Sequence, residues 1–236
     1  MKKIAFIVAY FTTTAMQSAL AAPNLQITEI WAGGLPGAEA TSDWFELTNF
    51  GDMPATGLDG TLYYDDDSFD ATKDDALFGV DTIAPGESVI YLVSWEDTFT
   101  GGVGDAIAAF TSMWGAPAGN LTGVQIGYVD GGSGLGGGGD TAVIFTGNTA
   151  SSPPVDYAAY SVNPQVESFV SLPDGTWVDN TFAQDGVWSA YQGNFNATDD
   201  VLSTPPIGSP GAVGVPEPAG IALAATGLLL LAIRRV

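Results

Sequence analysis

The chain of 236 residues carries an apolar stretch near each end, so only the part between them is left to form a soluble domain. Near the C-terminus, residues 219–233 hold no charge, and Thr226 is their only polar side chain. As a helix rising about 1.5 Å per residue, this stretch would be about 22 Å long, short of a hydrocarbon core of about 30 Å. Arg234 and Arg235 follow it and can reach head groups on the cytoplasmic side. The pattern predicts a marginal membrane helix at the C-terminus.

The first 21 residues have the three parts of a secretory signal peptide. Lys2 and Lys3 precede an apolar run over residues 4–11, and Ala19 and Ala21 give a small-x-small cleavage site. We predict that signal peptidase cleaves after Ala21. A retained N-terminal anchor is disfavoured because the apolar run is short and ends in threonines. The remaining part, residues 22–211, is long enough for one domain that buries roughly 70% of its unfolded surface.

This central part is strongly acidic. Lys73 is its single basic residue, and of the 27 acidic residues in the chain only Glu217 lies outside it. One positive against 26 negative charges leaves −25. Nucleic-acid binding requires Lys and Arg to displace phosphate counterions, so no nucleic-acid partner is expected, and phosphate substrates and anionic lipids are disfavoured for the same reason. High acidity favours solubility and affinity for cations.

The chain contains no cysteine and no histidine. Disulfides therefore cannot stabilise the exported domain. Serine or cysteine catalysis through histidine is excluded, as are histidine zinc sites.

Short apolar runs separated by Gly- and Pro-rich turns predict an all-β domain, since the chain has 31 Gly and 14 Pro. One segment predicts a helix instead, because apolar residues recur at helical spacing from Asp105 to Gly115. We expect this helix to cover one end of a sandwich. The predicted strands lie at residues 25–31, 44–47, 61–64, 88–93, 124–128, 141–145 and 155–160.

The C-terminal residues 212–236 resemble a known sorting signal. Val215, Pro216, Glu217 and Pro218 are followed by the apolar stretch and the two arginines. This arrangement resembles the PEP-CTERM signal of Gram-negative bacteria, which an exosortase processes. The resemblance implies transient anchoring in the inner membrane and delivery to the cell surface or extracellular matrix. Pro216 and Pro218 would hold Glu217 in an extended, non-helical segment for recognition. An ordinary C-terminal anchor remains the alternative.

The central domain carries motifs whose order resembles the lamin-tail domain of bacterial secreted proteins, an immunoglobulin-like β-sandwich. The resemblance implies that fold over residues 22–211 and a non-catalytic interaction role. It does not extend to a lamina function, because the chain has no coiled-coil rod and its acidity does not support DNA binding. The matching segments are 27–30, 43–49, 83–86, 89–93, 135–145, 155–156, 173–177 and 209–211.

An acidic segment at residues 65–75 is a candidate calcium site. Adjacent carboxylates repel each other, and a calcium ion with six to eight oxygen ligands would relieve that repulsion. Asp65, Asp67 and Asp70 are the candidate ligands, although the spacing is not that of an EF-hand. The alternative is a hydrated acidic loop between strands. No other cofactor is expected.

Tryptophan is the candidate residue type for glycan stacking. We expect Trp44 and Trp95 in the core, and Trp177 and Trp188, which lie in a less regular region, as candidates for exposed stacking on extracellular polysaccharide. The sequence thus favours an exported, exosortase-sorted surface protein without catalytic activity. Two alternatives stay open: a calcium- or glycan-binding adhesion module, and a surface hydrolase with paired carboxylates, which would need two acids about 5–10 Å apart in a cleft.

Overall fold

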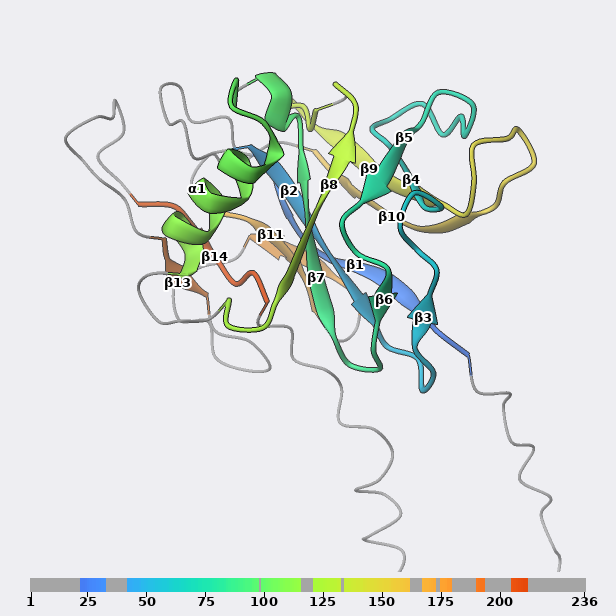
Figure 1. The fold of residues 1–236 in the computed structure, drawn as a ribbon, viewed down its shortest axis with the longest axis horizontal. Helices are drawn as coiled ribbons and strands as arrows, with labels where there is room; N and C mark the ends of the chain where they lie inside the picture. Colours follow the sequence, from blue (N-terminus) through green and yellow to red (C-terminus); the bar gives the residue numbers. More distant parts are fainter. Residues whose placement is uncertain are drawn as a thin grey trace, which may run out of the picture.

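The computed structural model describes residues 22–32, 42–97, 99–115, 121–132, 134–161, 167–172, 175–179, 190–193 and 205–211. Their fold is mostly β-structure with one α-helix, as the sequence predicts (Figure 1). The elements are β1 (Leu25–Trp31), β2 (Asp43–Asn49), β3 (Ala55–Thr56), β4 (Tyr63–Asp65), β5 (Asp75–Phe78), β6 (Thr82–Ile83), β7 (Ser88–Val93), the 3₁₀ turn η1 (Trp95–Asp97), α1 (Val103–Gly115), β8 (Gln125–Asp130), β9 (Asp140–Phe145), β10 (Pro154–Tyr160), β11 (Phe169–Ser171), β12 (Trp177–Asp179), β13 (Tyr191–Gln192) and β14 (Ile207–Gly208).

Ten strands form one curled sheet in the order β10-β9-β4-β5-β8-β7-β2-β1-β11-β12. The sheet curls so far that its edge strand β10 lies beside β1. The amide of Ile27 in β1 donates to the carboxylate of Asp156 in β10 at 2.8 Å. Every pair in this sheet is antiparallel except β7–β8. A parallel pair needs a crossover connection, and α1 lies in that crossover.

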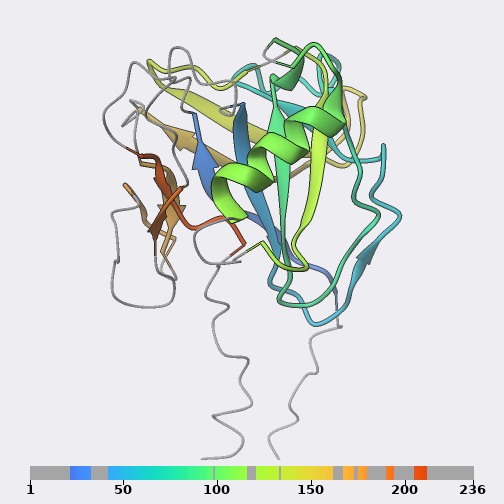
Figure 2. The same cartoon turned by 60° about the vertical axis from the view of Figure 1, so that its left-hand side comes forward.

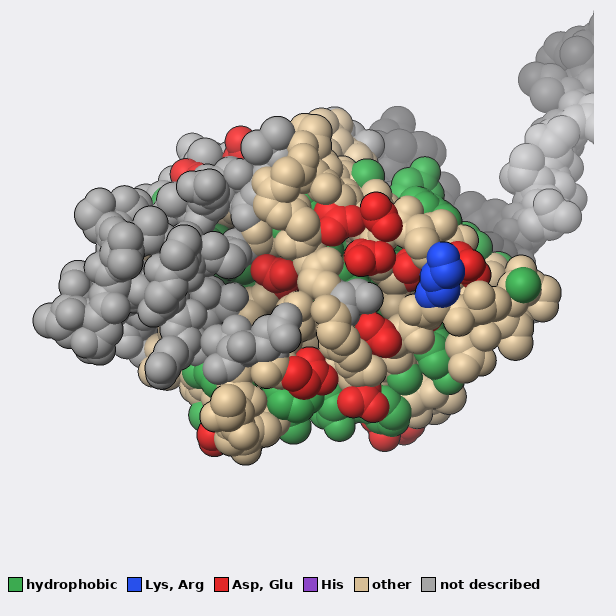
Figure 3. All heavy atoms as spheres, turned by 90° about the horizontal axis from the view of Figure 1, so that it is seen from above, with side chains coloured by type: hydrophobic (Ala, Val, Ile, Leu, Met, Phe, Trp, Pro, Cys, Tyr) green, Lys and Arg blue, Asp and Glu red, His purple; other side chains and the backbone are tan. Residues whose placement is uncertain are grey.

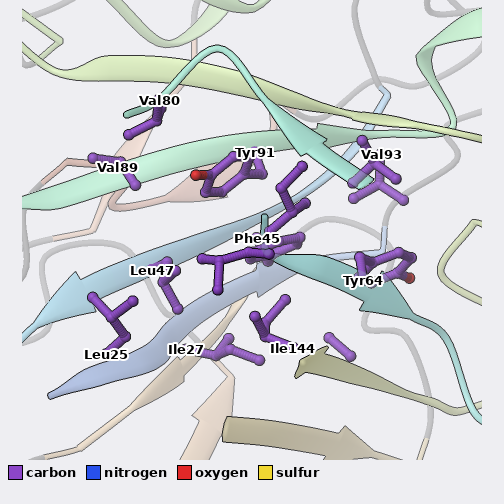
Figure 4. Packing of buried hydrophobic residues seen from close by; sticks show 14 of the residues in the cluster. Leu25, Ile27, Phe45, Leu47, Tyr64, Val80, Val89, Tyr91, Val93 and Ile144 are labelled. Carbon is purple, nitrogen blue, oxygen red and sulfur yellow. The ribbon is translucent and has the colours of Figure 1, made fainter. Parts of the chain in front are cut away.

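The concave side of the curled sheet holds the larger hydrophobic core. Strand alternation directs Phe45 and Leu47 of β2 into it, while Trp44 and Glu46 point to the other face. Phe45 stacks between Tyr64 and Tyr91 with ring centroids 5.7 and 5.4 Å apart (Figure 4). This aromatic stack joins β2, β4 and β7 across the middle of the core.

The helix α1 covers the opposite face of the same strands. Its buried residues Phe110 and Trp114 meet Trp31 and Trp44 in edge-to-face contacts, with centroids 5.5–5.7 Å apart. Figures 1 and 2 show the helix lying across β2, β7 and β8. The helix was correctly predicted, but its expected place at one end of a sandwich was wrong. The crossover between β7 and β8 carries it over the sheet face instead.

The predicted strands all occur, whereas β5, the two-residue strands and the strands beyond β10 were not predicted. Trp44 is buried as expected, but Trp95 is only half-buried and its indole N–H donates to the carbonyl of Val129 at 2.9 Å. None of the helices in the described part has the length and apolar character needed to span a membrane. The predicted membrane helix at 219–233 and the signal peptide lie outside the described residues.

Candidate functional site

The segment of residues 205–211, here called the C-terminal strap, lies beside α1 and continues the cover of the same sheet face (Figure 2). Its strand β14 pairs with β13, and the amide of Ser168 donates to the carbonyl of Ile207 at 2.9 Å. The amide of Gly193 donates to the carbonyl of Pro206 at 2.8 Å. Gly208 passes so close to α1 that an added Cβ would lie 3.0 Å from the ring of Trp114. The strap is therefore packed as part of the domain.

Glu29 fastens the strap to β1. Its Oε1 accepts from the amide of Ser209 at 2.7 Å and its Oε2 from the Ser209 hydroxyl at 2.8 Å, while the Ser168 hydroxyl also donates to Oε1. A register shift in the β1–β2 pairing lies between Ile27 and Glu29. Because such a bulge re-aims side chains, Glu29 can face the strap beside its neighbour Thr28.

Glu46 holds the end of the strap from the neighbouring strand. Its Oε2 accepts from the amide of Gly211 at 2.6 Å, and its Oε1 from the hydroxyl of Thr28 at 2.7 Å. We call Glu29 and Glu46, with their partners Ser168, Ser209 and Gly211, the carboxyl clamp. Both glutamates are completely buried. The clamp therefore ties the last described residues of the chain to two central strands.

No basic side chain in the described part of the chain neutralises this pair, since Lys73 lies in the β4–β5 loop beside Asp70. Burial raises the pKa of Glu46 from its usual 4.5 to about 8, and the charge of Glu29 adds to the rise, against the opposing effect of the bonds from Thr28 and Gly211. Glu46 is therefore mainly protonated at neutral pH. Two buried carboxyl groups in contact with one strap can coexist because one of them keeps its proton.

A chain of hydroxyl groups runs from Glu46 to Ser88, the first residue of β7. Thr28 Oγ1 lies 2.9 Å from Thr48 Oγ1, which lies 2.7 Å from Ser88 Oγ. Each hydroxyl both donates and accepts, so the chain satisfies polar groups that would otherwise be buried without partners.

A second pair of carboxylates braces the glycine-rich loop before β9. Asp43 accepts from the amide of Leu135 at 2.9 Å, and Asp140 accepts from the amide of Gly136 at 2.6 Å. The hydroxyl of Tyr160 donates to the carbonyl of Gly136 at 3.0 Å. Burial, and less strongly the charge of Asp140, raises the pKa of Asp43 to about 7. This glycine-rich loop is thus held by acidic side chains.

The three predicted calcium ligands do not converge. Asp65 is buried and accepts from the hydroxyl of Ser68 at 2.9 Å, whereas Asp67 is exposed. Asp70 accepts from the hydroxyl of Thr72 at 2.6 Å, and these bonds lower its pKa. Within the described ranges, no group of three acidic side chains is arranged to hold a metal ion. Calcium binding stays a prediction.

Asp74 lies in the same acidic segment but was not among the predicted ligands. Both of its carboxylate oxygens are closed off from solvent without a hydrogen-bond partner, although the residue as a whole is half-buried. Burial, and then the charges of Asp65, Asp70 and Asp75, raise its pKa to about 7.

Of the two predicted stacking tryptophans, Trp177 in β12 is half-buried and packs against the larger core. Trp188 lies outside the described residues, so the proposed pair stays untested. The same holds for the cleavage-site residues Ala19 and Ala21. It also holds for the sorting residues Val215, Pro216, Glu217, Pro218, Arg234 and Arg235.

Three short motifs that are far apart in the sequence meet at the carboxyl clamp. Residues 28–30 supply Glu29, residues 44–48 supply Glu46, and residues 209–211 supply the strap. Compared with protein-family models, curated proteins and solved structures, the chain matches none of them. The clamp carboxylates accept hydrogen bonds from the protein's own backbone, so the geometry assigns this pair to holding the chain.

Proposed function

We propose that this chain is an exported protein of a Gram-negative bacterium, sorted by its C-terminal tail to the cell surface or extracellular matrix. The observation that carries the proposal is the clamp on Gly211. The tail begins at the next residue, and Val215 of the sorting motif follows four residues after Gly211. Such sorting requires a domain that ends before the tail, so that the processing enzyme can recognise the tail separately.

The other end of the domain supports export. The backbone nitrogen of Ala22 donates to the carboxylate of Asp52 at 3.0 Å. Cleavage after Ala21 would turn this nitrogen into a charged ammonium group directly beside that carboxylate. The new N-terminus would therefore keep its partner and gain an ion pair, which for exposed groups contributes up to about 1 kcal/mol.

We further propose that the domain is an immunoglobulin-like, lamin-tail-like sandwich with a non-catalytic interaction role. The motifs that carry this resemblance supply both halves of the clamp, which supports reading them as one fold signature. The two carboxylate pairs described above hold backbone amides. They are therefore better suited to closing loops than to attacking a glycosidic bond.

The test is fractionation of cells that express the full chain. Replacing Glu217 by Ala should leave the protein in the membrane fraction, because the processing enzyme would no longer recognise the segment between the two prolines. The matched control is Asp67→Ala, which removes an exposed acid from the domain and should be released normally. Normal surface release of Glu217→Ala would rule out the sorting role.

A further inference from the structure

Two exposed aromatic side chains meet on the surface of the domain. Among the described residues, the exposed large hydrophobic side chains are Met53, Phe69 and Tyr157, at 45%, 49% and 57% exposure. Phe69, in the β4–β5 loop, and Tyr157, in β10, contact each other with ring centroids 5.4 Å apart and planes at 70°. We call them the aromatic pair. The rings come from segments nearly ninety residues apart in sequence, so the fold itself assembles the pair.

The backbone at Phe69 is held in an unusual conformation. Its φ of 51° lies in the left-handed region, which is disfavoured for a non-glycine residue. The loop is fastened on both sides of it. Ser68 bonds to Asp65, and Ala71 is buried against Val143 and Phe145 on the outer face of the sheet. These anchors hold the Phe69 ring in solvent, whereas a loop without them could turn the ring toward the protein.

The surroundings of the aromatic pair are polar and acidic. Asp67, Ser68 and Thr72 are exposed, and Asp66 and Asp70 are half-buried. The exposed Lys73 lies in the same loop, with its Nζ 3.7 Å from the carboxylate of Asp70. Figure 3 shows many acidic side chains on one face of the molecule and a single basic one. Carboxylates and hydroxyls next to exposed rings can accept hydrogen bonds from a ligand that presents hydroxyl groups.

We propose that the aromatic pair is a contact site for a neutral polysaccharide, with pyranose rings stacking on Phe69 and Tyr157. The flat faces of pyranose rings carry C–H groups, which the negative face of an aromatic ring attracts. The acidic side chains beside the pair would accept the sugar hydroxyls. An anionic ligand is disfavoured because the domain carries one basic against 26 acidic residues.

A protein partner fits this surface less well. The centres of protein interfaces are depleted in Asp and span about 800 Å² on each side. Here the two rings lie among five acidic or hydroxyl side chains and one lysine, Lys73, which is paired with Asp70. A sugar chain needs only one or two rings and a few acceptors, which is what the loop and β10 provide. The site is independent of the sorting tail, so it stands or falls separately from the proposed function.

The test measures binding of the full chain, purified in mild detergent, to cellohexaose and to N-acetylated chitohexaose by calorimetry up to about 10 mM ligand. Polygalacturonate serves as the anionic comparison. The variants are Phe69→Gly, which relieves the left-handed backbone as it removes the ring, Tyr157→Ser, and the double variant that combines them. The controls are Phe69→Tyr, which keeps a ring, and Met53→Ala, which removes an exposed hydrophobic side chain elsewhere.

The expected result is saturable binding of at least one neutral oligosaccharide, weakened about tenfold or more by Phe69→Gly and by Tyr157→Ser. Phe69→Tyr and Met53→Ala should bind as the wild type does. Three results would overturn the proposal: no binding of either neutral sugar, unchanged binding by the variant lacking both rings, or preference for polygalacturonate. A wild-type dimer that loss of the two rings dissociates would also overturn it, by assigning the pair to self-association.

Discussion

Glu46 in β2 accepts a hydrogen bond from the backbone of Gly211 at 2.6 Å, although the two residues are 165 positions apart. Glu29 in β1 holds Ser209, two residues earlier, in the same way. The first long strands of the domain therefore hold its last described residues. Each half of the clamp can be tested separately.

The first prediction concerns pH. Because burial raises the pKa of Glu46 to about 8, the folded state holds a proton that the unfolded chain releases near its usual pKa of 4.5. Stability should therefore fall as pH rises from about 4.5 to 8 and level off above that. Glu46→Gln mimics the protonated acid and should flatten this dependence in thermal unfolding from pH 5 to 9. An unchanged slope would show that Glu46 is ionised in the folded protein.

Other buried acids contribute to the same trend. Burial also raises the pKa of Asp43 and of Asp74 to about 7, and it raises the pKa of Asp156. These groups, like Glu46, make folding less favourable as they lose protons at higher pH. Asp70 does not contribute to this slope, because its bonds to Thr72 lower its pKa and it is ionised in both the folded and the unfolded chain above pH 5. Glu46→Gln is therefore expected to reduce the slope without removing it.

The second prediction concerns the strap. Replacing Gly208 by Ala places a Cβ 3.0 Å from the Trp114 ring and 3.1 Å from Glu29 Oε1, so either the strap or these side chains must give way slightly. Such overpacking should cost about 1–3 kcal/mol and speed proteolysis near residue 208. Gly137→Ala is the matched control, because a Cβ there would meet nothing within 4 Å. Equal stability of the two variants in urea would show that the strap is not packed as described.

Glu29→Ala tests the same strap from the sheet side. The change leaves the Ser209 amide, the Ser209 hydroxyl and the Ser168 hydroxyl without this acceptor. A loss of about 3 kcal/mol is expected, because a hydrogen bond to a charged group contributes about 1.5–3 kcal/mol and water or other partners can recover part of the loss. For a domain of this size the unfolding midpoint should fall by about 6–12 °C. A fall of less than about 2 °C would contradict a clamp role for Glu29.

The third prediction compares two tyrosines. The hydroxyl of Tyr64 is buried without a hydrogen-bond partner, whereas that of Tyr160 donates to the carbonyl of Gly136. Tyr64→Phe should be neutral or slightly stabilising, and Tyr160→Phe should cost about 1 kcal/mol. Equilibrium denaturation measures both. A larger loss from Tyr64→Phe would mean that its hydroxyl has a partner in solution.

The fourth prediction concerns the acidic loop. Asp74→Asn removes a charge that faces Asp65, Asp70 and Asp75, so it should raise the unfolding midpoint, and more at pH 8 than at pH 5. Asp67→Asn, at an exposed position, should have a smaller effect. The melts are repeated with chelator and with millimolar calcium. A calcium-dependent rise in the wild type that Asp74→Asn abolishes would instead assign the loop to a cation.

The long strands could be predicted because their apolar residues alternate or run continuously, as in β7. The helix was equally clear from its spacing. The two-residue strands β3 and β6 carry no periodicity, so nothing in the sequence marks them. The place of α1 depends on the parallel pairing of β7 with β8, which is a property of the whole sheet.

The clamp could not be predicted from local pattern. Glu29 and Glu46 alternate with apolar residues and resemble the solvent face of a half-buried strand. Their burial depends on a segment 165 to 180 positions further along the chain. The aromatic pair could not be predicted for a related reason, since Phe69 and Tyr157 lie 88 positions apart in the sequence. Only the fold brings these two rings together.

The most direct test of the account is the intact mass of the protein recovered from the surface of the native cell. The account predicts a chain that begins at Ala22 and lacks residues 219–233, while Glu217→Ala, recovered from membranes, keeps that segment. The signal peptide should be absent from both. A surface protein that still contains residues 219–233 would contradict the proposal that the tail is a processed sorting signal.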